Sequence, residues 1–415
     1  MFPFDEQAIG RHQRGEQSVL PTTHPSEQSA GLFALGAPVT HWAVKATQSV
    51  SYEIQLCDDV FALDNLTLLE DVTPAGGRPR RLLVVDANVD RLYGARIRAY
   101  LEHHDVIHRI CVIDSGETAK AMDTTLRIID ALDDFGIDRR REPVIGVGGG
   151  VLLDMVGFAC GMYRRATPYV RVPTTLIGLV DAAVGIKTGI NNNGHKNRLG
   201  SYFAADRTLL DRTFLGTLPH RHVSNGLAEV LKIALIKDGR LFELFAQHAG
   251  QFVTTRMQHP ADAATELLER AIQGMLEELQ PNLWEKVLER VVDYGHTFSP
   301  TLEMHALPEL LHGEAVSVDM ALTTVLAERR GLLDAGQRRE ILAVMAALRL
   351  PTWHPLCTPD TLGRALRDTV RHRDGQQRLP LPIGIGSATF VNDVTDAELA
   401  EAARALAEAR FEVTR

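Results

Sequence analysis

The stretch Gly148-Gly149-Gly150-Val151-Leu152-Leu153-Asp154 decides the fold of this chain. It follows the apolar run 143–147 (PVIGV), which is typical of a buried parallel strand. A buried strand that runs into a glycine-rich turn and a helix brings main-chain N–H groups against the phosphates of a dinucleotide. The same glycines can serve only the steric needs of a tight turn, and this stretch alone leaves both interpretations open.

Strand-like and helical segments alternate upstream of this stretch. Buried strands are predicted over residues 81–86 and 110–114, and helical apolar spacing covers residues 90–104 and 117–135. This alternation predicts a parallel sheet with its ligand at the carboxyl ends of the strands. The polar residues that fall at such ends are Asp86, Asn88 and Glu117.

The second half of the chain has a helical pattern. Apolar residues recur at helical spacing over 222–237, 261–279 and 314–330. With 415 residues, the chain is longer than one hydrophobic core usually supports. We therefore expect an N-terminal arm, an α/β domain and a helical domain, with the bounds 1–45, 46–213 and 214–415. The arm lacks helical or strand periodicity, so we expect it to be mobile or to lie as a strap on a neighbouring surface.

The composition argues against several classes of partner. Hydrophobic residues make up 45% of the chain, charged residues 23%, and the net charge is −9. Nucleic acid or an anionic membrane would require a basic face, so we expect neither as a partner. The four cysteines form no Cys-x-x-Cys pair, and no export signal or long apolar span stands out. These features favour reduced thiols and a cytoplasmic location.

Three residues of the second half could form a metal site. Glu229 lies in GLAEVLK, His296 in DYGHT and His312 in HGEA. One carboxylate and two imidazoles suit a catalytic zinc ion that keeps a position open for substrate oxygens. Each histidine taken singly could equally make an ordinary polar contact, and the spacing alone leaves that alternative open.

The ordered set of motifs resembles one family, the dehydroquinate synthase-like sugar phosphate cyclases. The resemblance implies a Rossmann-like α/β N-terminal domain, an all-α C-terminal domain, bound NAD⁺, one divalent metal ion (Zn²⁺ or Co²⁺) and a homodimer. The motifs are, in chain order, GGGVxxD, RVPTTL, VDxxVxxKT, GxKN, LxTLP, GxAExxK, GHT and HGEAV.

The resemblance assigns roles to individual residues. The NAD⁺ contacts that it implies are Asp86, Asn88, Glu117, Lys120, Gly149, Gly150, Asp154, Thr174, Thr175 and Thr217. The implied metal ligands are Glu229, His296 and His312. The implied catalytic residues are Asp181, Lys187, Lys232 and Asp293, and the implied substrate-binding residues are Arg165, Lys196, Asn197, Pro300 and His372.

Arg165 resembles an arginine that reaches the substrate phosphate of the neighbouring subunit. It is followed here by Ala166, where dehydroquinate synthases have glycine, so the local turn can differ. Asp293 and Pro300 stand where those enzymes have asparagine and a second histidine, which makes the pocket less suited to a substrate carboxylate. Pro300 could also be simply the first-turn proline of a helix.

These departures, together with residues 278–285 and 372–375, resemble the branch of the family that acts on sedoheptulose 7-phosphate. The implied chemistry is transient oxidation by NAD⁺, β-elimination of phosphate, re-reduction and intramolecular aldol closure. The valiolone-forming enzymes are favoured over the gadusol-forming ones, and the stereochemistry of the ring stays open. A metal-dependent polyol dehydrogenase and a catalytically silent NAD-binding protein are alternatives from other classes.

Overall fold

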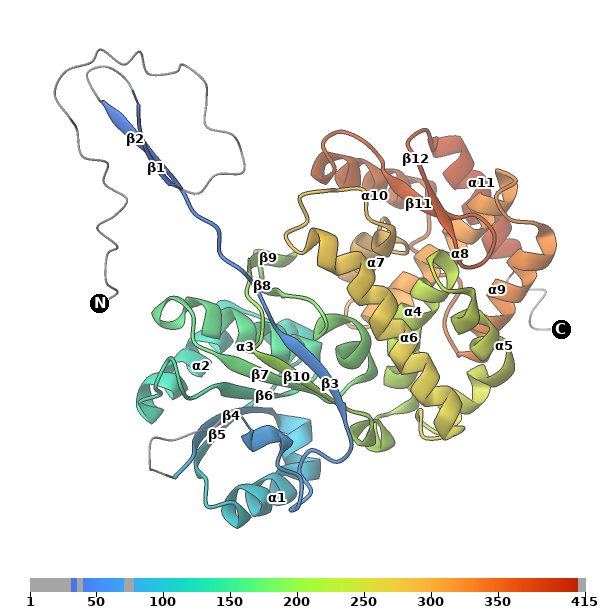
Figure 1. The fold of residues 1–415 in the computed structure, drawn as a ribbon. Helices are drawn as coiled ribbons and strands as arrows, with labels where there is room; N and C mark the ends of the chain where they lie inside the picture. Colours follow the sequence, from blue (N-terminus) through green and yellow to red (C-terminus); the bar gives the residue numbers. More distant parts are fainter. Residues whose placement is uncertain (1–30, 36–39, 71–77, 410–415) are drawn as a thin grey trace. The chain divides into compact units, whose positions relative to one another are not determined.

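The first half of the chain is built on a six-stranded parallel sheet (Figure 1). The computed structural model describes residues 31–35, 40–70 and 78–409. The strand order is β3-β10-β7-β6-β4-β5. The chain adds β5 on one side of β4 and β6 on the other, so the order reverses between β4 and β6. The strands are β3 (Glu53–Cys57), β4 (Arg80–Asp86), β5 (Ile107–Ile113), β6 (Val144–Gly148), β7 (Tyr169–Pro173) and β10 (Arg207–Asp211).

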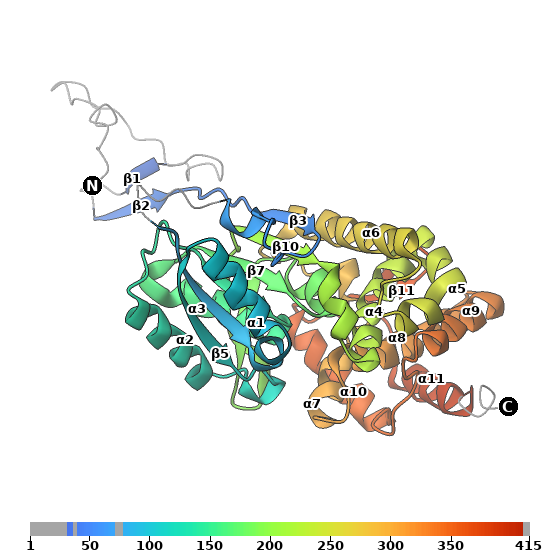
Figure 2. The same cartoon turned by 90° about the horizontal axis from the view of Figure 1, so that it is seen from below.

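Helices cover both faces of this sheet (Figure 2). Leu82 and Val84 of β4 pack in one buried cluster with α2 (Met122–Phe135) and α3 (Gly150–Met162). Leu83 and Val85 pack in a second buried cluster with α1 (Ala87–His103). Successive side chains of a strand point to opposite faces, so a continuous apolar run is what a sheet covered on both sides requires. The predicted α/β architecture is therefore confirmed.

The predicted helix over residues 117–135 is wrong at its start. Residues Glu117–Ala119 form a short 3₁₀ helix, Ala121 is extended, and α2 begins only at Met122. The main-chain carbonyl of Lys120 accepts a hydrogen bond from the N–H of Asn191 at 2.8 Å. That carbonyl is thus used outside the helix, and the break lets the Lys120 side chain turn into the protein.

The second half is mainly helical, with α4 and α8 packed together at its centre. Both are buried along most of their length, and Glu229 lies on α4. A Cβ on Gly313 would approach the carbonyl oxygen of Asn225 to 2.0 Å, so glycine is required where α8 begins against α4. The helices are α4 (His220–Ile236), α5 (Gly239–Thr254), α6 (Ala261–Leu279), α7 (Ser299–His305), α8 (His312–Arg329), α9 (Ala335–Ala347), α10 (Pro359–His372) and α11 (Asp396–Ala409).

Two hairpins after β7 lie outside the six-stranded sheet, one in each half of the chain. β8 (Lys187–Asn192) and β9 (His195–Tyr202) pair antiparallel after β7. β11 (Leu379–Pro382) and β12 (Ala388–Val391) pair within the helical half, which is thus not entirely α. The strand pattern of β11 is interrupted by two prolines, which obscures it in the sequence. The domain boundary at residues 213 and 214 stays a prediction.

The N-terminal residues 1–50 form a separate unit. Within it, β1 (Gly31–Leu35) pairs antiparallel with β2 (His41–Lys45). The expectation of no strand before residue 46 is therefore wrong for these two segments, which are too short to show a clear period. Residues 1–30 and 36–39, on which the rest of the arm prediction falls, lie outside the described residues. Among the described helices, none has the length and apolar character that crossing a membrane demands.

Candidate active site

The carboxyl ends of β4 and β6 meet at the reversal of strand order, where doubly wound sheets bind their ligands. Asp86 ends β4 and caps α1, because its carboxylate accepts hydrogen bonds from the N–H groups of Asn88 at 2.8 Å and Val89 at 3.2 Å. The Ser115 hydroxyl donates to the other oxygen of Asp86. Asp86 is thereby oriented at the crevice, and the Asn88 side chain is exposed beside it.

The glycine-rich turn after β6 fits both predicted roles of its glycines, the steric need of a tight turn and the binding of phosphate. A Cβ on Gly150 would come within 2.9 Å of the Cβ of Ala182, so packing inside the protein already requires glycine there. Gly149 is the N-cap of α3 and offers no side chain, and the first turn of α3 holds no acidic residue. The N-terminal N–H groups of this helix therefore fit a pyrophosphate.

The three predicted threonines lie at the ends of neighbouring strands. Thr174 is buried directly after β7, and the Thr175 hydroxyl accepts a hydrogen bond from the N–H of Gly178 at 3.2 Å. Thr217 follows β10, and its hydroxyl lies 2.8 Å from the hydroxyl of Tyr93. The structure thus brings these residues to the same edge of the sheet as Asp86 and Gly149.

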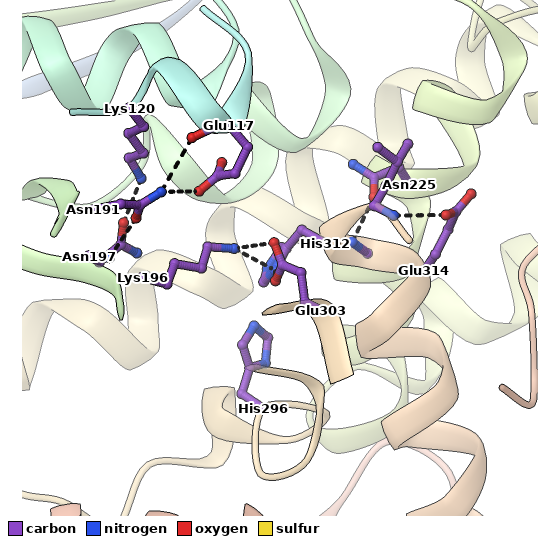
Figure 3. Close-up of polar contacts among 12 residues, drawn as sticks. Glu117, Lys120, Asn191, Lys196, Asn197, Asn225, His296, Glu303, His312 and Glu314 are labelled. Atoms are coloured by element: carbon purple, nitrogen blue, oxygen red, sulfur yellow. Dashed lines mark hydrogen bonds and ion pairs between the residues drawn. The ribbon is translucent and has the colours of Figure 1, made fainter. Parts of the chain in front are cut away.

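Lys120 and Glu117 are tied to the β8–β9 hairpin (Figure 3). The buried Lys120 ammonium lies 2.6 Å from the carboxylate of Asp154 and 2.6 Å from the carboxamide oxygen of Asn197. The carboxamide of Asn191 donates to Glu117 at 2.8 Å and accepts from the N–H of Asn197 at 2.8 Å. Burial raises the pKa of Asp154, although the Lys120 ammonium opposes this effect.

The three predicted metal ligands come together from α4, the turn before α7 and the first residue of α8. One ligand atom from each of Glu229, His296 and His312 lies within 4.8 Å of the others. The Nε2 atoms of His296 and His312 are 3.6 Å and 3.4 Å from Oε1 of Glu229. These distances are longer than hydrogen bonds, and both imidazoles face the same carboxylate oxygen.

The surroundings of these three residues fit a divalent cation. Nδ1 of His296 lies 3.0 Å from the carbonyl oxygen of Tyr294, and Nδ1 of His312 lies 2.9 Å from Oε2 of Glu303. Such partners orient histidines that bind metal through the other ring nitrogen. Burial raises the pKa of Glu229, but Lys232 and the two imidazoles outweigh it and hold that pKa well below its usual range. The Glu229 carboxylate is therefore ionised, as metal ligation requires.

Cationic side chains surround the three residues. Lys232 lies 2.6 Å from Glu229, and the Lys196 ammonium lies 2.5 Å from Oε1 of Glu303. Lys187 forms an ion pair with Glu285. Desolvation among the neighbouring groups and the charge of Arg290 lower the pKa of Lys187 to about 8, even though its side chain is half-exposed. Asp181 lies in the short π-helix Gly178–Ala182, close enough to raise the pKa of Lys232.

Asp293 has partners that the sequence did not suggest. Its carboxylate pairs with the guanidinium of Arg290 and lies 3.2 Å from Nη2 of Arg373. His372 is exposed at the end of α10, whereas the next residue, Arg373, is buried and faces Asp293. Pro300 is an exposed proline in the first turn of α7, which agrees with the alternative that it only begins a helix. The substrate roles of His372 and Pro300 stay predictions.

Arg165 lies apart from these residues, in a strained and exposed turn. Arg164, Arg165 and Ala166 have φ angles of 49°, 63° and 99°, which is unusual for three consecutive residues other than glycine. Arg139 donates to the carbonyl oxygen of Arg164 and closes the turn. The role of Arg165 at a neighbouring subunit stays a prediction.

Sequence reasoning did not single out Asn191, Glu285, Arg290, Glu303 and Arg373. Arg290 and Arg373 carried a weak signal, because they lie within a few residues of Asp293 and His372. Glu303 carried none, because its role at His312 depends on how α7 packs against α8.

Comparisons with known proteins show the family of this chain. Residues 110–225 match the family 3-dehydroquinate synthase N-terminal, and residues 226–370 match 3-dehydroquinate synthase C-terminal. The 2-epi-5-epi-valiolone synthase of an Actinoplanes species is 62% identical over 366 residues, which are 87% of this chain and 92% of that protein. The demethyl-4-deoxygadusol synthase of Trichormus variabilis is 42% identical and covers 88% of this chain and 90% of its own.

A solved structure gives the same result. ValA, the 2-epi-5-epi-valiolone synthase of Streptomyces hygroscopicus subsp. jinggangensis, has a TM-score of 0.85 and 54% identity to this chain. The match covers 89% of this chain and 100% of ValA, and ValA has NAD⁺ and Zn²⁺ bound. The chain therefore belongs to the dehydroquinate synthase-like sugar phosphate cyclases, within the group of the 2-epi-5-epi-valiolone synthases.

Proposed function

We propose that this protein converts sedoheptulose 7-phosphate to 2-epi-5-epi-valiolone and inorganic phosphate. The observation that carries the proposal is the β8–β9 hairpin, which joins the crevice of the sheet to the candidate metal site. Asn197 on this hairpin contacts Lys120, and the adjacent Lys196 contacts Glu303 beside His312. A substrate oxygen at the metal ligands and a nicotinamide in the crevice would therefore both lie next to this hairpin. The 62% identical relative supports the choice of reaction.

Two groups complete the site in this proposal. The crevice residues from Asp86 to Thr217 hold NAD⁺, and Glu229, His296 and His312 hold one divalent metal ion, either Zn²⁺ or Co²⁺. When bound, NAD⁺ accepts and returns a hydride, and the metal ion polarises the substrate oxygens. The reaction is redox-neutral overall, so NAD⁺ acts catalytically.

The chain's own residues bind and orient the sugar phosphate. Lys187, Lys196 and Lys232 supply ammonium groups for the phosphate and the hydroxyls, because phosphate prefers charge-assisted hydrogen bonds. Asp181 and Asp293 accept hydrogen bonds from substrate hydroxyls and fix the ring-closing geometry. Asn197 positions the hairpin, and Pro300 and His372 border the entrance.

The proposal includes a second subunit. Arg165 is exposed, and we assign it to the phosphate of the neighbouring active site in a homodimer. The proposal also retains the division into an α/β cofactor domain and a helical domain near residue 213. All four cysteines are free thiols, which supports a cytoplasmic location.

Product analysis by NMR tests the proposed function. Metal-loaded protein with catalytic NAD⁺ is incubated with sedoheptulose 7-phosphate, and a parallel sample receives 3-deoxy-arabino-heptulosonate 7-phosphate. We expect phosphate release and a 2-epi-5-epi-valiolone ring only in the first sample. Ring couplings of 2-epi-valiolone or a gadusol, dehydroquinate in the second sample, or steady accumulation of NADH would each contradict the proposal.

A pair of histidine variants supplies the control. His296→Ala should lose metal binding and phosphate release together. His305→Ala changes an exposed histidine whose Nδ1 lies 2.7 Å from the carbonyl oxygen of Thr301, and it should retain both properties. Metal content measured on the purified proteins separates loss of the ion from loss of folding.

A further inference from the structure

We infer that Asp293 masks a carboxylate-binding pair of guanidiniums, Arg290 and Arg373, and thereby restricts the site to sugar phosphates without a carboxylate. This inference rests on the proposed function, since it names the feature that selects the substrate class. The pocket would already contain the cations that a carboxylate-bearing substrate needs. One internal carboxylate occupies them.

Arg373 is held as a fixed, buried cation. Its side chain is only 9% exposed, and Nη1 donates to the carbonyl oxygens of Gln377 at 3.0 Å and Arg378 at 2.9 Å. Nη2 faces Asp293 at 3.2 Å. Three hydrogen bonds therefore aim the guanidinium plane at one carboxylate position, which leaves it little freedom to turn elsewhere.

Arg290 approaches the same carboxylate from the other side. Its Nη2 pairs with Oδ1 of Asp293 and its Nε lies 3.3 Å from Oδ2, so one guanidinium spans both oxygens. Nη1 of Arg290 pairs with Glu285, which also pairs with Lys187. The cluster thus holds three cations and two carboxylates, and it reaches the residues that surround the substrate.

Charge balance makes the mask effective. The ionised Asp293 carboxylate occupies the position that both guanidiniums face, so an incoming substrate carboxylate meets an anion there instead of two free cations. A neutral hydroxymethyl ketone meets no such repulsion and can donate a hydrogen bond to Asp293. Removing the charge at residue 293 would leave Arg373 buried without its counter-ion, a costly arrangement that a ligand carboxylate would relieve.

The variant Asp293→Asn tests this inference, because asparagine has the shape of aspartate and lacks its charge. Binding of 3-deoxy-arabino-heptulosonate 7-phosphate and of sedoheptulose 7-phosphate is measured by calorimetry on the metal-loaded protein without NAD⁺, so that neither compound is oxidised during the titration. We expect D293N to bind the carboxylate-bearing compound at least about tenfold more tightly than the wild type does, as a charge-assisted pair allows. The gain should disappear in the double variant D293N/R373M.

Asp368→Asn is the matched control. Asp368 forms an exposed i,i+3 ion pair with Arg371 at 3.1 Å, the same spacing as Asp293 and Arg290. D368N should bind both compounds as the wild type does. An unchanged affinity of D293N for the carboxylate-bearing compound, or an equal gain in D293N/R373M, would overturn the inference.

Thermal melting keeps the inference testable if D293N folds poorly. An unpaired Arg373 predicts that D293N melts below D293N/R373M and that the carboxylate-bearing compound raises the melting temperature of D293N more than that of the double variant. Equal melting of the two variants would contradict the mask. Failure of the wild type to act on sedoheptulose 7-phosphate would refute the proposed function instead, and these binding and melting results would stand apart from it.

Discussion

The surroundings of single side chains in the site shift their pKa values to different extents. Lys187 shows this most clearly, since desolvation and the nearby Arg290 charge lower its pKa to about 8. A lysine that binds phosphate must be protonated, so its contribution is present below this pH and is lost as the pH rises through about 8.

We therefore predict an alkaline limb in kcat/KM near pH 8 that belongs to Lys187. In Lys187→Arg the charge persists, because an arginine stays protonated to a much higher pH, and the limb should shift upward. Initial rates of phosphate release across the pH range measure this. Lys286→Arg, at an exposed neighbouring lysine, should leave the limb in place, and a limb that also stays in place in Lys187→Arg would assign it to another group.

Ala166 shows strain at the scale of one residue. Its φ of 99° and ψ of 111° lie where glycine is favoured, and such a conformation costs about 1–3 kcal/mol in other residues. Ala166→Gly should stabilise the protein by about 1 kcal/mol after the added entropy of the unfolded chain is subtracted.

Denaturant unfolding of Ala166→Gly checks this prediction. Gly136→Ala is the reverse control, because Gly136 has a φ of 64° at the end of α2 with open space around it. It should destabilise the protein by about 1 kcal/mol. The same sign of change in both variants would show that the φ angle at Ala166 carries no strain.

At the scale of elements, the β8–β9 hairpin is the part that connects the two groups of site residues. Its polar side chains contact Glu117 and Lys120 at the sheet and Glu303 beside α8 (Figure 3). The Asn191 carboxamide donates to Glu117 and accepts from the N–H of Asn197 within the hairpin, and the Asn197 side chain contacts Lys120. The hairpin thus links Glu117 and Lys120 to Lys196 and Glu303.

We predict that Asn191→Ala weakens NAD⁺ binding about five- to tenfold. The variant removes two hydrogen bonds, each worth about 1 kcal/mol, and frees Glu117 and the hairpin backbone to move. Calorimetric titration with NAD⁺ measures the change. His195→Ala, exposed on the same hairpin, should bind NAD⁺ as the wild type does, and equal affinity in Asn191→Ala would assign Asn191 a purely local role.

For the whole molecule, the proposed function assigns Arg165, which lies in an exposed turn, to the active site of a second subunit. We predict that Arg165→Ala and Glu229→Gln are each inactive but that a mixture of the two, unfolded and refolded together, regains activity. A mixed dimer would contain one site with Glu229 from the first variant and Arg165 from the second.

Phosphate release by the refolded mixture measures this complementation. The two proteins mixed without unfolding serve as the control and should stay inactive as long as subunits do not exchange. No recovery after joint refolding, with a dimer present by light scattering, would place Arg165 in its own subunit's chemistry or outside the site.

Local patterns account for most of the elements and for the candidate ligands. The apolar run before Gly148 predicted β6, and the helical spacing around Glu229 predicted α4. Both predictions succeed because the spacing of apolar residues along the chain reflects the local secondary structure. The helical spacing predicted the wrong start for α2 at residues 117–121, where the carbonyl of Lys120 accepts a hydrogen bond from the distant Asn191 instead of a bond within the helix. The ordered motifs predicted Glu229, His296 and His312 as metal ligands, and these residues lie together in the structure.

The sequence by itself determined the alternation of strands and helices, the glycine turn at the sheet and the residue types of the site. Only the tertiary structure determined which charged and polar side chains form ion pairs and hydrogen bonds with one another. Asp293 and Arg373 are separated by 80 residues and Asn191 and Glu117 by 74. Such pairs form only when separate elements pack at a particular distance and angle, because side-chain ion pairs and hydrogen bonds act over a few ångströms and leave no periodic trace along the chain.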